Sequence, residues 1–96
     1  MTGKYTYIAF CDVDTRATSP DKMRALFAKE DELAKKNDVE IVLRGTPFGV
    51  SAGYVTIYRT DKYIDDLMNM IMETGRSEYV RSSTTLTITP LIFRPS

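Results

Sequence analysis

Two residue types that often carry catalysis or bind metals, histidine and cysteine, are nearly missing from this chain. Its 96 residues include no histidine and no tryptophan, and Cys11 is its one cysteine. The chain therefore lacks the commonest general base near neutral pH and the commonest metal ligand. A single thiol also excludes an internal disulfide and a zinc site built from spaced cysteines and histidines. We expect no catalytic residues, no metal site and no cofactor.

An excess of charge of one sign and long apolar runs are also missing. The 13 basic and 13 acidic residues give a net charge of zero, whereas a nucleic-acid-binding domain usually has a basic excess. No apolar run approaches the roughly 18 residues that a membrane-spanning helix needs, and the N-terminus lacks the pattern of a signal peptide. We therefore expect a cytoplasmic protein that has no membrane contact and for which nucleic acid is a disfavoured partner.

What the chain does contain is a clear first helix. Ser19, Pro20 and Asp21 supply a capping side chain, a proline at the first helical position and an acid near the positive end of the helix dipole. Lysines followed by Asn37 are typical of a helix end. The apolar side of this helix has the expected spacing and consists of Met23, Leu26, Phe27, Leu33 and Ala34.

A second helix and four strands complete the pattern. Thr60 or Asp61 caps the second helix, and Gly75 ends it. Its apolar stripe comprises Ile64, Leu67, Met68, Ile71 and Met72. The segments with strand character are residues 5–11, 40–44, 54–59 and 84–93. Residues 45–53 and 76–83 are predicted to be loops, the second with the solvated arginines Arg76 and Arg81, and Pro90 limits the pairing of the last strand.

This order of elements predicts one α+β domain over residues 1–96 with the ferredoxin-like βαββαβ fold. Its antiparallel sheet of four strands has both helices on one face. Because the first strand is apolar on both faces, the open face needs a second cover, and we expect a homodimer through it. From the alternation of side chains we place Ile8, Phe10, Val55 and Ile57 under the helices. The open face then carries Tyr5, Tyr7, Cys11, Tyr54 and Tyr58.

With this element order and the segment Gly53-Tyr54-Val55-Thr56-Ile57, the chain resembles the dimeric α/β-barrel superfamily, whose ferredoxin-like subunits pack their open sheet faces together. It is similar there to the ligand-sensing domains of feast/famine regulators. It is also similar to small stand-alone domains named for a Gly-Tyr-Asp motif, in which Val55 takes the place of the aspartate. Haem-ligating members of the superfamily rely on histidine, which this chain lacks. The resemblance implies a homodimer that binds a small molecule or acts in regulation.

Arginine and tyrosine side chains near residues 45–53 predict a ligand site. Arg44 and Arg59 stand at strand ends, where guanidinium groups hold a carboxylate or phosphate through charge-assisted hydrogen bonds. Tyr54 and Tyr58 are suited to cover an apolar part of the same molecule. We therefore expect a small anionic ligand that is bound by Arg44, Tyr54, Tyr58 and Arg59.

Two functions of other classes stay open. A barrel-type enzyme acting on a small acidic substrate would use Arg44, Tyr54 and Asp12 as its polar groups. A nucleic-acid-binding module would stack bases on the strand tyrosines, because the element order is also that of an RNA-recognition domain. In this chain, however, Thr56 replaces the second ring of that domain's motif.

The acidic pair Asp12 and Asp14, just beyond the first strand, is a candidate for a divalent cation or for turn capping. The segment Phe10-Cys11-Asp12-Val13 is similar to the end of the first strand in the small CRISPR-associated subunit. That resemblance would imply a metal-dependent nuclease, but the basic character of that family is missing here. We therefore favour turn capping for both aspartates.

Overall fold

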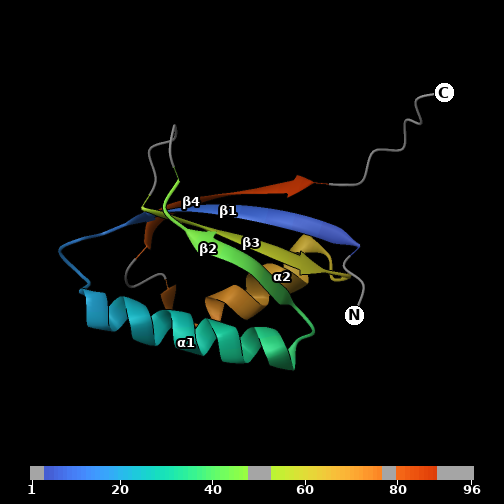
Figure 1. Ribbon diagram of the computed structural model, residues 1–96, viewed down its shortest axis with the longest axis horizontal. Coiled ribbons are helices and arrows are strands. Elements are labelled where there is room, and N and C mark those ends of the chain that lie inside the picture. Colours follow the sequence, from blue (N-terminus) through green and yellow to red (C-terminus); the bar gives the residue numbers. More distant parts are fainter. Residues whose placement is uncertain (1–3, 48–52, 77–79, 89–96) are drawn as a thin grey trace.

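The computed structural model describes residues 4–47, 53–76 and 80–88, and it confirms the predicted order of elements. The four strands form one antiparallel sheet in the order β2-β3-β1-β4, so that β2 and β4 are its edges. Both helices cover the same face of this sheet, and none of the described helices or strands lies on the opposite face (Figure 1). The elements are β1 Tyr5–Val13, α1 Pro20–Lys36, β2 Glu40–Gly45, β3 Tyr54–Thr60, α2 Ile64–Met72 and β4 Val80–Ile88.

Helix α1 begins and ends where its sequence signals predict. The backbone N–H of Lys22 donates to Oγ of Ser19 at 3.2 Å, and Pro20 occupies the first turn. At the other end, the side-chain amide of Asn37 donates to the carbonyl oxygen of Leu33 at 2.7 Å. Local hydrogen bonds therefore fix both ends, which is why this helix was readable from the sequence.

The start of helix α2 differs from the prediction. Its N-cap is Tyr63, which makes no capping hydrogen bond with its side chain. The hydroxyl of Thr60 instead accepts from the backbone N–H of Lys62, and the carboxylate of Asp61 accepts from the backbone N–H of Lys4. The two predicted caps thus stabilise the turn before the helix and the start of β1.

No helix in the described ranges has the length and apolar character needed to cross a membrane.

The two faces of the sheet are the reverse of the predicted ones. The side chains beneath the helices are those of Tyr7, Ala9, Cys11, Tyr54, Thr56 and Tyr58, all buried. Alternation could not choose between the faces, because β1 is apolar on both. Which face the helices cover follows from the hydrogen-bond partners of the tyrosine hydroxyl groups. The hydroxyl of Tyr7 donates to the carbonyl oxygen of Lys62 at 2.7 Å, and that of Tyr58 donates to Glu30, so both rings are buried with their polar ends satisfied.

The connection into β4 is also shorter than predicted. Strand β4 begins at Val80, opposite Val13, and Ser83 pairs with Cys11, so the end of the predicted loop belongs to the sheet. Arg76, predicted to be solvated, is only 4% exposed. The predicted end of the last strand and Pro90 lie outside the described residues.

Candidate ligand pocket

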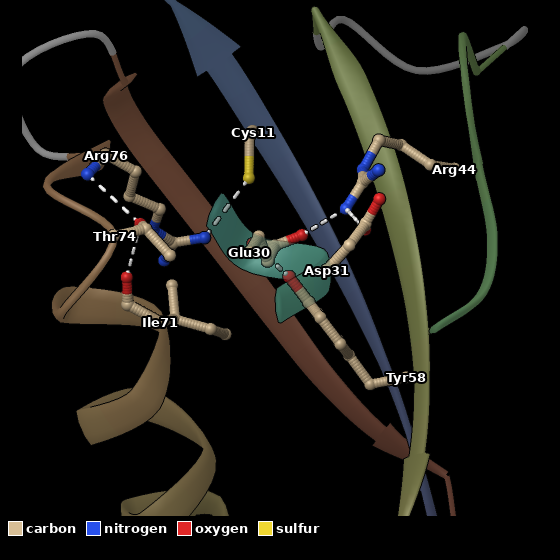
Figure 2. Close-up of polar contacts among 8 residues, drawn as sticks. All are labelled: Cys11, Glu30, Asp31, Arg44, Tyr58, Ile71, Thr74 and Arg76. Carbon is tan, nitrogen blue, oxygen red and sulfur yellow. Dashed lines mark hydrogen bonds and ion pairs between the residues drawn. The ribbon is translucent and has the colours of Figure 1, made fainter. Parts of the chain in front are cut away.

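Glu30 is the centre of a buried polar cluster between α1 and the sheet (Figure 2). It lies four residues after Leu26 and four before Ala34, on the buried side of α1, and is 3% exposed. One carboxylate oxygen accepts from Nη2 of Arg44 at 2.6 Å, and the other accepts from the hydroxyl of Tyr58 at 3.0 Å. The carboxylate therefore joins α1 to β2 and β3.

The charge of Arg44 is balanced more than once. Besides Glu30, its Nη2 also donates to the carboxylate of Asp31 at 3.0 Å, and its guanidinium stacks over the ring of Phe27, 4.3 Å from the centroid. Burial disfavours the charged form, but the hydrogen bonds and ion pairs to Glu30 and Asp31 outweigh it and raise the pKa of Arg44. Arg44 is thus a fixed cation with two anionic partners.

Arg76 occupies the other side of the cluster. Its guanidinium donates to Sγ of Cys11 at 3.4 Å, and its backbone N–H donates to the hydroxyl of Thr74 (Figure 2). The guanidinium also donates to Oγ of Ser83 at 3.1 Å. Cys11 is fully buried, and burial raises the pKa of its thiol despite the nearby cation. The thiol stays protonated near neutral pH, which makes it a poor nucleophile. Tyr54 lies opposite Cys11 on β3. The pKa of Tyr54 is also raised, mainly by burial and to a smaller extent by the Cys11 thiol.

A pocket of about 370 Å³ opens beside this cluster. It lies between the first half of α1, the ends of β1 and β2 and the start of β3. Its walls include the apolar side chains of Val13, Met23 and Phe27 and the polar side chains of Arg44, Thr46 and Tyr54. A larger groove of about 650 Å³ follows α1 and the edge strand β2, but the charged Asp31, Lys35 and Glu40 contribute to its walls. The smaller pocket has the apolar walls and few polar groups that are typical of small-molecule sites.

Two buried polar atoms in the described part of the chain have no hydrogen-bond partner. They are Nε of Arg44 and Oγ1 of Thr56. The two residues face each other on β2 and β3, and both lie on the helix-covered side of the sheet. Thr56 is completely buried, and Arg44 lines the pocket. Both atoms can donate a hydrogen bond.

The structure brings together three of the four residues predicted to bind a ligand. Arg44 and Tyr54 line the pocket. Tyr58 belongs to the same cluster, but it is fully buried and its hydroxyl is bound to Glu30. Arg59 is separate from the other three: it points to the opposite face of the sheet, is 45% exposed, and lies 4.0 Å from Glu40.

Sequence reasoning missed Glu30 and Arg76, because charged residues are placed at the surface by default. The spacing of Glu30 with Leu26 and Ala34 was a usable signal, since it sets the carboxylate in the apolar stripe. Nothing comparable distinguishes Arg76, whose guanidinium depends on tertiary contacts with Cys11 of β1 and Ser83 of β4.

The acidic pair beyond the first strand makes contacts with the protein itself. The carboxylate of Asp12 accepts from Arg81 at 2.8 and 3.1 Å, and that of Asp14 accepts from the backbone N–H of Arg16 at 3.0 Å. Asp12 lies on the open side of the sheet and does not reach the pocket, so an enzyme site of Arg44, Tyr54 and Asp12 is not assembled. In the described ranges, no three acidic or cysteine side chains lie close enough together to hold a metal ion.

Comparison with known proteins identifies the fold alone. No protein-family model matches the chain, and no curated protein matches it either. A hypothetical protein of Arabidopsis thaliana is similar in structure, with a TM-score of 0.67 and 8% identity over 98% of this chain and 94% of the other. A dimeric ferredoxin-like protein of unknown function from Thermobifida fusca has a TM-score of 0.58 at 13% identity, covering 94% and 93%. Another, from Bacteroides fragilis, has a TM-score of 0.54 at 12% identity, covering 88% and 94%. The chain therefore has an α+β ferredoxin-like fold.

Proposed function

We propose that this protein is a homodimer that binds a small molecule, in which two copies meet through their open sheet faces and each copy holds one ligand pocket. The observation that carries the proposal is the continuous apolar surface on the face without helices. This open face comprises Ile8, Phe10, Leu43, Val55, Ile57, Leu86 and Ile88. Three of these side chains are about half exposed in the isolated subunit: Leu43 at 57%, Leu86 at 49% and Ile88 at 46%.

The register makes this surface continuous across all four strands. Leu43, Ile57, Ile8 and Leu86 stand side by side in one row from β2 to β4. The ion pairs that the described part of the chain forms on this face lie near its ends, with Asp12 and Arg81 at one end and Glu40 and Arg59 at the other. An apolar centre with a polar rim is the usual composition of a stable protein interface.

A second copy of the same chain is the occupant that fits best. An aliphatic surface without charges in its centre is complementary to itself, as a twofold interface requires. The similar proteins from Thermobifida fusca and Bacteroides fragilis, which share the fold, are described as dimeric. The pocket lies on the other side of the sheet, so dimerisation leaves it accessible. A sensing role, as in the feast/famine regulators, is compatible with this arrangement.

Light scattering coupled to size exclusion tests the dimer directly. The chain has a mass of 10.9 kDa, and we expect twice this mass at micromolar concentration. Ile57→Glu would bury a charge in the centre of the interface and should give a folded monomer. Lys29→Gln changes the net charge by the same amount on the exposed side of α1 and should stay dimeric. A monomeric wild type, or a dimeric Ile57→Glu variant, would disprove the interface.

The nucleic-acid-binding alternative depended on strand tyrosines that could stack on bases, and these tyrosines are not exposed. Tyr7, Tyr54 and Tyr58 are buried beneath the helices, and among the described residues Phe10 is the one aromatic side chain of the open face. Stacking on successive bases requires exposed rings. The same residues that argued for nucleic acid therefore argue for a packed core.

A further inference from the structure

The ligand class that suits the pocket of the proposed function, on which this inference rests, depends on the charge of Arg44. Arg44 is the one charged side chain among the described residues that line the pocket. Its Nη2 lies 2.6 Å from the carboxylate of Glu30 and 3.0 Å from that of Asp31. One positive and two negative charges leave these three groups with a net charge of −1. An anion bound at Arg44 would therefore meet two like charges close by, and the buried one is only weakly screened.

Most of the other wall surface is apolar. Met23 contributes a flexible thioether, and the rings of Phe27 and Tyr54 pack edge to face with their centroids 5.1 Å apart. The hydroxyl of Tyr54 interacts with the fully buried thiol of Cys11, so the polar end of this side chain belongs to the core. Thr46 is also polar, but it is uncharged and exposed. These walls offer an anion no second positive charge in place of its hydration shell.

We infer that the pocket selects an uncharged, mainly apolar molecule of the size of a substituted aromatic ring, and that Glu30 and Asp31 determine this selectivity by neutralising Arg44. A dry cavity of about 150 Å³ is enough to bind benzene. The volume of about 370 Å³ therefore leaves room for substituents on the ring. The inferred ligand differs in charge from the small anion that the sequence led us to expect.

Three probes of nearly the same shape differ in charge: nitrobenzene is neutral, benzoate is an anion and benzamidine is a cation at neutral pH. Each is titrated to millimolar concentration into protein that carries ¹³C in its methionine methyl groups. Met23 lines the pocket, whereas Met70 is buried in the core and serves as the internal reference. Nitrobenzene should move the Met23 signal and bind about tenfold more tightly than benzoate. Benzamidine should also bind more weakly than nitrobenzene, because the charged group in the pocket wall is the cation Arg44.

A matched pair of variants tests the role of Asp31. Asp31→Asn removes one of the two carboxylates that neutralise Arg44, and it does so at a side chain that is 55% exposed. The preference for nitrobenzene over benzoate should then fall about threefold. Glu32→Gln changes the net charge by the same amount at the next, exposed position of α1 and should retain the full preference. Equal preferences in the two variants would show that Asp31 does not determine the charge of the ligand.

The outcomes also distinguish this inference from the proposed function. Tightest binding of benzoate would overturn the inference, restore the anion site and leave the pocket in place. Tightest binding of benzamidine, or equal affinity for all three probes, would overturn it as well. If no probe moves the Met23 signal while light scattering still shows a dimer, the pocket of the proposed function is disproved and its dimer stands.

Discussion

At the scale of single residues, the carboxylate of Glu30 is the most consequential group in the fold. It accepts from Arg44 and Tyr58 in a place that is almost fully buried. Glu30→Gln would leave Arg44 with only Asp31, which is 55% exposed. Removing one partner of a buried ion pair typically lowers the free energy of unfolding by about 3 to 5 kcal/mol. Urea unfolding followed by circular dichroism measures this loss.

The neighbouring exposed Glu32 provides the control for this experiment. Glu32→Gln should change the free energy of unfolding by no more than about 0.5 kcal/mol. Replacing the whole pair, as in Glu30→Leu with Arg44→Met, should be less damaging than the sum of the two single changes, because no isolated charge remains buried. Equal effects of Glu30→Gln and Glu32→Gln would show that the cluster contributes nothing to stability.

Buried tyrosines give the protein a predictable response to alkaline pH. The pKa of Tyr58 lies above its ordinary value of 10.0, mainly because of burial and secondly because of the charge of Glu30. Burial also raises the pKa of Tyr54 and that of Tyr7. The unfolded chain therefore loses these protons first. The stabilisation is complete below pH 10 and is lost as the pH rises from there towards the folded-state pKa.

The free energy of unfolding should fall above pH 10 by up to about 1.4 kcal/mol per pH unit for each such group. Urea unfolding at several pH values between 8 and 11 gives the slope. Tyr58→Phe removes one titrating group and should make the slope shallower by about one proton. An identical slope in the variant would mean that Tyr58 ionises as freely in the folded protein as in the unfolded chain.

At the scale of elements, the strand β1 and the residue before β3 meet at Gly53. Its backbone N–H donates to the carbonyl oxygen of Cys11 at 2.8 Å, and a Cβ atom at this position would lie 2.9 Å from Cγ2 of Val13. Gly53→Ala should therefore lower the free energy of unfolding by about 1 to 3 kcal/mol through overpacking. Gly45→Ala, where a Cβ atom meets nothing within 4 Å, is the control.

Thermal or urea unfolding distinguishes the two alanine variants. Val13→Ala should partly restore the stability of Gly53→Ala, since it removes the methyl group that the new Cβ contacts. If Gly53→Ala were as stable as Gly45→Ala, the close approach between the end of β1 and the start of β3 would not exist in solution.

The helices and the order of elements were predictable because their signals are local. Ser19 and Asn37 mark the ends of α1, and the apolar spacing marks its buried side. The faces of the strands were not predictable, since β1 has apolar residues at every position from Tyr7 to Cys11. Only the tertiary partners of the tyrosine hydroxyls decide which face is covered. The site was half predictable for the same reason: Arg44 and Tyr54 follow from strand ends, whereas Glu30 depends on packing.

Adjacent positions of β1 provide a direct test of the two faces. Tyr7 is 1% exposed beneath the helices, whereas Ile8 lies on the open face. Tyr7→Glu would bury an unpaired carboxylate in the core and should abolish folding, as seen by the loss of the circular dichroism signal. Ile8→Glu should keep that signal and give a monomer by light scattering. The reverse pair of results would restore the faces predicted from the sequence.

At the scale of the whole molecule, the proposed dimer links stability to protein concentration. If two chains unfold together, mass action makes the melting temperature rise with concentration. For two chains of 96 residues, the entropy of unfolding is about 0.4 kcal/mol/K. A tenfold change in concentration should therefore shift the melting temperature by about 3 to 4 °C. Scanning calorimetry at several concentrations between about 1 and 100 μM measures this shift.

The Ile57→Glu variant, as a folded monomer, should melt at one temperature throughout that range, because its unfolding involves a single chain. A wild-type melting temperature that does not change with concentration would show that single chains unfold, with the open face already exposed in the native protein. The homodimer would then have to be abandoned.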